Sequence, residues 1–239
     1  MASVYLGRLR GAAGFVRTVA IKCLHPALTR DPETVAMLID EAHIASRIRA
    51  PNVVPILDVT SEDGELFLVM EYVHGESLGK LLHEVRARGE AVPPSIASGI
   101  VSGLLSGLHA AHEARGDDGT PLDIVHRDVS PQNVMVGVDG VSRVVDFGIA
   151  KAATRAQTTQ EGQIKGKLGY MAPEQLRAQP VDRRTDVFAA AIVLAEMLSG
   201  KRLFDGDDAG AIVGRILLGK VPAPSSLRDG ISPEVVSVV

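Results

Sequence analysis

The sequence predicts an α+β fold, in which a small antiparallel β-sheet with one helix precedes a mostly helical region. Two observations favour this class. Short apolar runs separated by turn residues dominate the first 73 residues, and longer segments with helical character begin after residue 77. The chain of 239 residues is also long enough for one large domain or for two lobes that share a cleft.

The N-terminal part combines four expected strands with one helix. Turn residues at 11–14 and 61–64 would join them into hairpins, with strands at residues 4–9, 15–24, 56–60 and 66–72. Helical periodicity over residues 32–49 places the apolar side chains on one face, with Asp31 as the expected N-cap and Pro32 in the first turn.

Helices dominate the rest of the chain, and they are expected at residues 77–88, 94–115, 184–200 and 210–218. A short hairpin of residues 134–138 and 142–145 turns at Asp139-Gly140 and ends directly before Asp146. His109 and His112 lie three positions apart on the long helix. No further ligand has suitable spacing, so we expect a packed or surface role for both instead of a metal site.

The composition favours a soluble protein of a reducing compartment, and we expect the chain to be cytoplasmic. A net charge of −4 provides no electrostatic footprint for nucleic acid or for anionic lipid. Cys23 is the only cysteine, which excludes an internal disulfide framework, and its apolar neighbours indicate a strand residue. The longest mostly apolar run, residues 187–198, is too short to span a bilayer and contains Glu196, and no signal peptide is expected.

The string HRDVSPQN, residues 126–133, contains the residue types that metal-assisted phosphoryl transfer requires. Asp128 would accept or orient the proton of an incoming hydroxyl group. Asn133 and Asp146 would supply oxygen ligands for Mg²⁺, a hard cation that prefers carboxylate, amide and phosphate oxygens. The spacing of these three residues therefore predicts a site for phosphoryl transfer.

Together with Asp146-Phe147-Gly148, this string resembles the protein kinase family, whose catalytic loop reads H-R-D-x-x-x-x-N and whose metal-binding motif reads D-F-G. VAIK at residues 19–22 and APE at residues 172–174 extend the resemblance over almost the whole chain. The strings look most like the eukaryotic-like Ser/Thr kinases of bacteria.

The resemblance implies a two-lobed kinase domain, with an N-lobe of residues 1–73, a C-lobe of residues 74–239 and ATP in the cleft between them. It also implies in-line transfer of the γ-phosphoryl group of Mg-ATP to Ser or Thr hydroxyls of protein substrates. Tyrosine kinases usually carry an arginine near Ser130 or Gln132, and neither position has one.

The resemblance further assigns nucleotide contacts. Lys22 would bind the α- and β-phosphates, and Glu41 on the first helix would pair with Lys22 and hold it in place. Without the resemblance, Lys22 reads as an exposed strand-edge residue and Glu41 as a solvated helix residue. The other contacts would come from Val4 in the phosphate-covering loop, Ala20 and Met135 on either side of adenine, Met70 behind it, and the backbone of Glu71 and Val73.

Regulation is implied for the stretch between Asp146 and APE. Thr158 or Thr159 is the best candidate for autophosphorylation, which would bring two copies of the kinase together, and Arg127 resembles the arginine that binds such a phosphate. In the alternative interpretation, both threonines are ordinary polar residues of a mobile loop. Asp186 would cap the helix that follows and, as in the family, accept hydrogen bonds from the catalytic-loop backbone.

Two departures from the family concern the ends of the chain. The glycine-rich phosphate loop is missing, because Ala2 stands at its third glycine and Val4 matches its final valine. The chain also stops at Val239, before the last helices of the larger lobe and the arginine that normally pairs with Glu174. We therefore expect a kinase domain trimmed at both ends.

A third departure lies beside the catalytic aspartate. Ser130 occupies the position where Ser/Thr kinases usually carry a lysine that touches the γ-phosphate, and Lys167 stands where they usually have threonine. Our hypothesis is that Lys167 supplies the missing positive charge from the other loop, while Ser130 forms a hydrogen bond with Asp128. In the alternative interpretation, Lys167 is merely exposed to solvent and Ser130 is a neutral replacement.

Two other functions stay open. One is a pseudokinase, a binding or scaffold module without transfer, which the missing glycine loop and Ser130 favour. The retained residues Lys22, Asp128, Asn133 and Asp146 argue against it. The other is a small-molecule kinase such as an aminoglycoside phosphotransferase, which shares a catalytic Asp and Asn. The APE segment and the loop before it favour a protein substrate.

Overall fold

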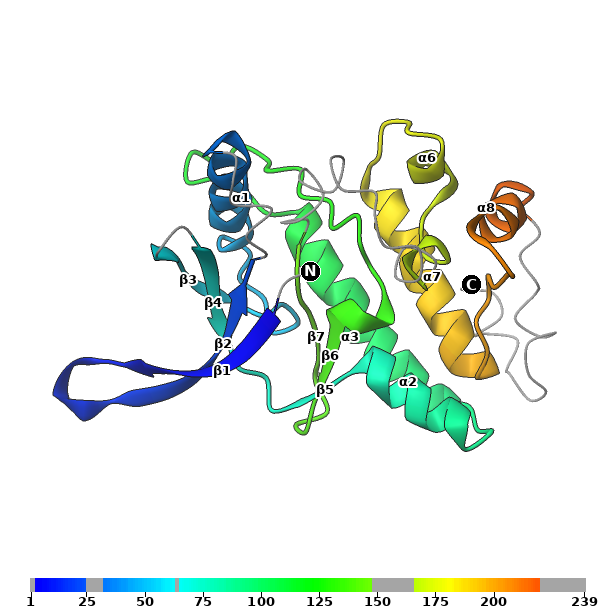
Figure 1. The fold of residues 1–239 in the computed structure, drawn as a ribbon, viewed down its shortest axis with the longest axis horizontal. Coiled ribbons are helices and arrows are strands. Elements are labelled where there is room, and N and C mark those ends of the chain that lie inside the picture. The colour runs from blue at the N-terminus through cyan, green and yellow to red at the C-terminus, as the bar shows by residue number, and fades with distance from the viewer. Residues whose placement is uncertain (1–2, 25–31, 63–64, 148–165, 220–239) are drawn as a thin grey trace.

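The computed structural model of the chain describes residues 3–24, 32–62, 65–147 and 166–219. The N-terminal part is a four-stranded antiparallel sheet with the strand order β1-β2-β4-β3. Its elements are β1 (Ser3–Arg10), β2 (Val16–Cys23), α1 (Pro32–Ala45), β3 (Ile56–Glu62) and β4 (Glu65–Glu71). Figure 1 shows α1 beside this sheet, and the two are joined by a small core of Leu24, Leu38, Ala42, Val54, Leu66, Leu68 and Met70.

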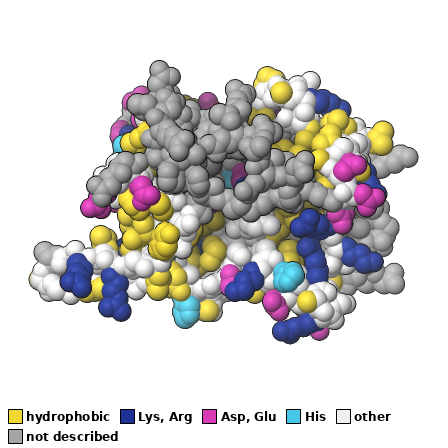
Figure 2. Space-filling view, viewed as in Figure 1, with side chains coloured by type: hydrophobic (Ala, Val, Ile, Leu, Met, Phe, Trp, Pro, Cys, Tyr) yellow, Lys and Arg dark blue, Asp and Glu magenta, His cyan; other side chains and the backbone are white. Residues whose placement is uncertain are grey.

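The hairpin of β1 and β2 is long and projects from the sheet (Figure 1). Its turn is a 3₁₀ segment, Ala12–Gly14, in which Ala13 and Gly14 both have positive φ. Figure 2 shows Lys and Arg side chains along the hairpin and hydrophobic ones gathered where it joins the sheet. At its base the register pairs Val4 with Lys22, which places both residues over the same face of the sheet.

The second part is mostly helical and holds the larger core. It contains α2 (Leu78–Ala87), α3 (Pro94–His112), α6 (Pro173–Leu176), α7 (Arg183–Ser199) and α8 (Ala209–Leu217), with a small sheet of β5 (Gly75–Ser77), β6 (Val134–Gly137) and β7 (Ser142–Val144). Leu104 of α3 and Val193 and Met197 of α7 are fully buried in the core of this part. Figure 1 shows α3 and α7 running through its centre.

Side-chain caps explain where several helices begin. Ser77 accepts a hydrogen bond from the Lys80 N–H at the start of α2, and Asp182 accepts one from the Arg184 N–H at the start of α7. Helix α7 ends at Gly200, whose φ of 70° is a left-handed conformation that glycine adopts at little cost. Among the described helices, none combines the length and the apolar character needed to cross a bilayer.

Backbone hydrogen bonds between residues 52–54 and strand β7 form a junction between the two parts. The Val54 N–H donates to the Val144 carbonyl (2.9 Å), and the Val144 N–H donates to the Asn52 carbonyl (2.8 Å). Helix α3 packs closely on this junction because Gly107 has no side chain: a Cβ there would lie 2.5 Å from the Asn52 carbonyl oxygen. Strand β7 is thereby fixed to the N-terminal part just before Asp146.

The structure confirms the predicted α+β class, and the predicted elements recur with small shifts at their ends. The largest shift is at α1, which stops at Ala45 and not at residue 49. The next is at α3, which stops at His112 and not at residue 115. Beyond it the polar loop makes a turn of its own, in which the Gly116 N–H donates to the Thr120 carbonyl and the Leu122 N–H to the Ala114 carbonyl. These bonds compete with a further helical turn.

Candidate active site

A cavity of about 330 Å³ lies between the N-terminal sheet and strand β6, within the range of small-molecule sites. All seven residues predicted to contact the nucleotide line it: Val4, Ala20, Lys22, Met70, Glu71, Val73 and Met135. The prediction missed other lining residues, namely Tyr5, Leu6, Val54, Tyr72, Gln132 and Val145. Gln132 lies within the HRDVSPQN string but was given no role, and the others belong to no motif, so only the folded chain could identify them as lining residues.

Lys22 and Asp146 meet at one end of this cavity. Lys22 Nζ lies 2.8 Å from Asp146 Oδ1, and the lysine is almost completely buried. The contact is an ion pair without hydrogen-bond alignment, since the buried Oδ1 has no hydrogen-bond partner among the described residues. Asp146 has a φ of 62°, a strained backbone conformation of the kind found at functional sites. Glu41, expected to pair with Lys22, belongs to α1, but the structure does not describe its side chain. The ion pair between Glu41 and Lys22 therefore stays a prediction.

Asp128 is held through one oxygen of its carboxylate. Lys167 Nζ lies 2.7 Å from Oδ2, and the amide nitrogen of Asn133 donates to the same oxygen at 3.2 Å. The Asn133 amide also donates to the Asp128 backbone carbonyl at 2.8 Å. A short 3₁₀ turn, Pro131–Asn133, folds the chain back and makes these contacts between residues five apart possible.

Asp186, in the first turn of α7, is fully buried beneath the catalytic loop. Its Oδ2 accepts the backbone N–H of His126 and its Oδ1 that of Arg127, both at 2.8 Å. These bonds confirm the contact predicted between Asp186 and the catalytic-loop backbone. His112, not assigned to any site from the sequence, also lies 2.8 Å from Asp186 Oδ2 through its Nε2.

His126 joins the catalytic loop to the segment that carries Asp146. Its Nδ1 accepts the Asp128 N–H (3.2 Å), so its Nε2 carries the hydrogen that is donated to the Val145 carbonyl (2.9 Å). The imidazole is completely buried and its centroid lies 4.8 Å from that of Phe147. The two segments that hold Asp128 and Asp146 are therefore locked together by one side chain.

The predicted hydrogen bond between Ser130 and Asp128 is wrong. Ser130 is 1% exposed, and its hydroxyl has no hydrogen-bond partner in the described part of the chain. The extended backbone at Ser130 (φ −161°, ψ 161°) turns its side chain into the interior. Lys167 and Asn133 meet Asp128 at the place where a serine hydroxyl was expected.

The APE segment docks against the catalytic loop through α6. Gln175 donates from its side-chain nitrogen to the Arg127 carbonyl (2.9 Å), and its side-chain oxygen accepts the Ala172 N–H (3.0 Å). Glu174, whose arginine partner was expected to be missing, accepts a hydrogen bond from the buried Thr185 hydroxyl at 2.6 Å. Thr158 and Thr159, the candidate phosphorylation sites, lie outside the described residues, so a phosphate partner for Arg127 stays a prediction.

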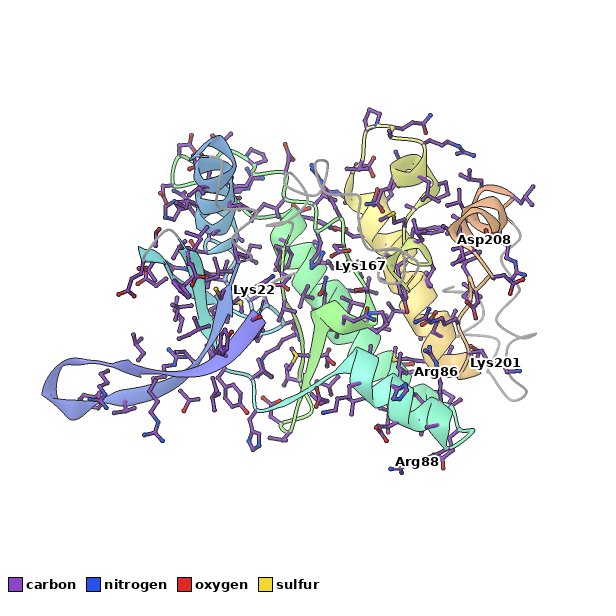
Figure 3. All side chains as sticks on the ribbon, viewed as in Figure 1. Lys22, Arg86, Arg88, Lys167, Lys201 and Asp208 are labelled. Atoms are coloured by element: carbon purple, nitrogen blue, oxygen red, sulfur yellow. The ribbon has the colours of Figure 1, made fainter. Side chains whose placement is uncertain are left out.

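The segment that carries Lys167 is anchored to α7. Tyr170 donates its hydroxyl to Glu196 Oε2 at 2.7 Å, and Arg86 of α2 lies 2.9 Å from the same oxygen. Burial, reinforced by the adjacent Glu196 carboxylate, raises the pKa of the Tyr170 phenol far above its ordinary range. Figure 3 shows Lys22 at the N-terminal sheet and Lys167 toward the helices of the second part.

The sequence of the chain is similar to those of known protein kinases. Residues 2–229 match the family described as the protein kinase domain. Tyrosine-protein kinase MasK of Myxococcus xanthus is 38% identical over 239 residues, which are 100% of this chain and 37% of MasK. Serine/threonine-protein kinase PknH of Mycobacterium tuberculosis is 39% identical over 222 residues, covering 93% of this chain and 34% of PknH.

A solved structure shares the fold. The kinase domain of Mycobacterium tuberculosis PknI, as a C20A mutant, matches with a TM-score of 0.68 at 27% sequence identity, over 95% of this chain and 76% of that one. The chain thus spans between 34% and 37% of the length of the curated relatives MasK and PknH.

Proposed function

The chain belongs to the protein kinase domain family, and on this premise we propose that it transfers the γ-phosphoryl group of ATP to Ser and Thr hydroxyls of protein substrates. One observation carries the proposal: Lys22 and Asp146 line a largely apolar cavity as an ion pair, and His126 joins the loop of Asp128 to the segment that carries Asp146. Phosphoryl transfer needs little covalent chemistry from the protein, so positioning and charge neutralisation supply most of the catalysis.

The cavity suits adenine. Ala20 of β2 and Met70 of β4 line it from the N-terminal sheet, and Met135 of β6 lines it from the second sheet. Glu71 directs its side chain outward to an ion pair with Arg17 (2.9 Å), so its backbone is the part that faces the ring. Lys22, already at the phosphate end, would bind the α- and β-phosphates.

The donor set also fits a divalent cation. Asp146 presents a carboxylate, a hard oxygen ligand, at the cavity: its buried Oδ1 is ion-paired with Lys22 but accepts no hydrogen bond among the described residues. Asn133, the second expected ligand, lies next to Asp128. Asp146 and Asn133 would hold Mg²⁺, which when bound neutralises charge on the phosphates. Asp128 would orient the acceptor hydroxyl and take its proton, as the bond from the γ-phosphorus to the acceptor oxygen forms and ADP leaves.

Several observations bear on the acceptor. The absence of arginine at Ser130 and Gln132 and the similarity to PknH support Ser and Thr. Similarity to MasK over the whole chain favours tyrosine as the second candidate. The docking of α6 on the catalytic loop through Gln175 supports a protein substrate over a small molecule. Autophosphorylation at Thr158 or Thr159, in a pair of kinase copies, extends the same proposal.

The test is a phosphoamino-acid analysis. The chain is incubated with Mg²⁺, γ-labelled ATP and a basic protein substrate, with Lys22→Met as the matched control, and the label is assigned after acid hydrolysis. Label on phosphoserine or phosphothreonine that is lost in the control is the expected result. Label on phosphotyrosine alone overturns the Ser/Thr assignment. Mg²⁺-dependent nucleotide binding without any incorporation overturns the transfer reaction and favours a scaffold.

A further inference from the structure

Lys167 and Asp128 lie 39 positions apart in sequence, yet their side chains are in direct contact at 2.7 Å. The lysine is half exposed and the carboxylate 21% exposed, so solvent reaches both members of the pair. Lys22 is the only cationic side chain among the described residues that line the cavity, and it is paired with Asp146. Lys22 therefore serves Asp146, whereas Lys167 brings a positive charge to the catalytic carboxylate Asp128.

The contact fixes how the Asp128 carboxylate is turned. Both Lys167 and Asn133 bind Oδ2, and Oδ1 makes no hydrogen bond in the described part of the chain. The bond from Asn133 is long, whereas a bond from an ammonium group to a carboxylate is charge-assisted and stronger. Lys167 is thus the main restraint on the side-chain rotation of Asp128, and it leaves Oδ1 to face an acceptor hydroxyl.

The backbone of Lys167 is itself well anchored. Its carbonyl accepts the Tyr170 N–H (3.1 Å), and Tyr170 is tied to the buried Glu196 of α7. Leu168 is buried next to it, and Gly169 approaches the Phe204 carbonyl so closely that a Cβ would lie 3.0 Å away. The ammonium group is therefore presented to Asp128 by a segment held against the helical core.

Resting on the proposed function, we propose that Lys167 is a positioning residue for phosphoryl transfer, which orients Asp128 from the segment before α6 in place of a catalytic-loop lysine. Ser130, at the position of that lysine, is buried and turned away, so the catalytic loop does not provide the charge there. The orientation of the Asp128 carboxylate then depends on the docking of residues 166–171 against the helical core, because this segment carries Lys167.

The test separates charge from structure with four forms of the chain: wild type, Lys167→Met, Lys167→Arg and Lys201→Met. Lys201 is exposed and lies near the C-terminal end of α7, away from Lys167 (Figure 3). We expect Lys167→Met to lower kcat by roughly 10- to 100-fold, the loss of one charge-assisted bond, while KM for ATP changes by less than about threefold. Lys167→Arg should recover most of this loss, and Lys201→Met should match wild type.

An unaltered kcat in Lys167→Met overturns the inference. A loss of kcat in Lys167→Arg equal to that in Lys167→Met also overturns it, because the positive charge would then not be what orients Asp128. A thermal melt and ATP titration of each variant identify any loss of folding, and Lys167→Gln replaces a variant that fails the melt. Wild type that transfers no phosphate contradicts the proposed function instead, so the two failures are distinguishable.

Discussion

Asp186 of α7 and His112 of α3 are in contact at 2.8 Å, with both side chains buried, although 74 positions separate them in the sequence. The same carboxylate binds the backbone of the catalytic loop at His126 and Arg127. One buried group therefore connects the two central helices to the loop that carries Asp128. The placement of the catalytic residue depends on the core beneath it.

Asp186→Asn should lower both stability and turnover. An amide keeps one acceptor oxygen and turns its NH₂ toward groups that already donate, so at least one buried N–H loses its partner. We expect the free energy of unfolding to fall by about 1–3 kcal/mol and kcat by at least about tenfold, measured by urea unfolding and phosphate transfer. Asp208→Asn, at the N-cap of α8, is the matched control, because asparagine caps as well as aspartate. Equal behaviour of the two variants would contradict this role of Asp186.

Two glycines of α3 should respond oppositely to the same substitution. Gly99 has open space around the position of a Cβ, so Gly99→Ala should stabilise the fold by about 0.5–1 kcal/mol through helix propensity. At Gly107 a Cβ would lie 2.5 Å from the Asn52 carbonyl oxygen, so Gly107→Ala should destabilise by about 1–3 kcal/mol. Urea unfolding of both variants measures the contrast. A gain at both positions would show that α3 does not pack on the junction as described.

Asp182, the N-cap of α7, should make the free energy of unfolding depend on pH. Hydrogen bonds from the Arg184 guanidinium and backbone N–H lower the pKa of Asp182 from its ordinary value of 3.8 to about 2. The folded state therefore holds this group ionised more readily than the unfolded state does. Its contribution is full above the unfolded pKa and is lost as the pH falls from about 4 toward about 2.

Asp182→Asn keeps the cap but removes the titration. The difference in free energy of unfolding between wild type and this variant should shrink between about pH 6 and about pH 3, measured by urea unfolding. A difference that stays constant over this range would mean that the ion pair with Arg184 does not stabilise the folded state.

Much of the fold and the site could be predicted from the sequence because the signals are local. Short apolar runs bounded by turn residues predicted the strands, and helical periodicity predicted the helices. Short motifs identified Lys22, Asp128, Asn133 and Asp146 without any knowledge of their partners. The proximity of Lys167 to Asp128 was also predictable, because the exchanged residue types at positions 130 and 167 pointed to a common location.

The partners themselves were harder to predict because they depend on side-chain direction across distant segments. Nothing in the sequence marks Thr185 as the partner of Glu174, since any nearby hydroxyl would satisfy the carboxylate. Ser130 was expected to face Asp128 because of its position in the motif, yet the extended backbone turns it inward. The buried contact of Glu196 with Tyr170 and Arg86 likewise exists only once α2 and α7 have packed.

The most direct measurement compares phosphate transfer by wild type and Asp128→Asn under saturating Mg-ATP, with nucleotide affinity measured alongside. We expect the variant to bind ATP as wild type does but to lose at least about 100-fold in kcat, because the residue that accepts the hydroxyl proton is gone. Equal turnover in the two proteins would show that Asp128 does not catalyse phosphoryl transfer.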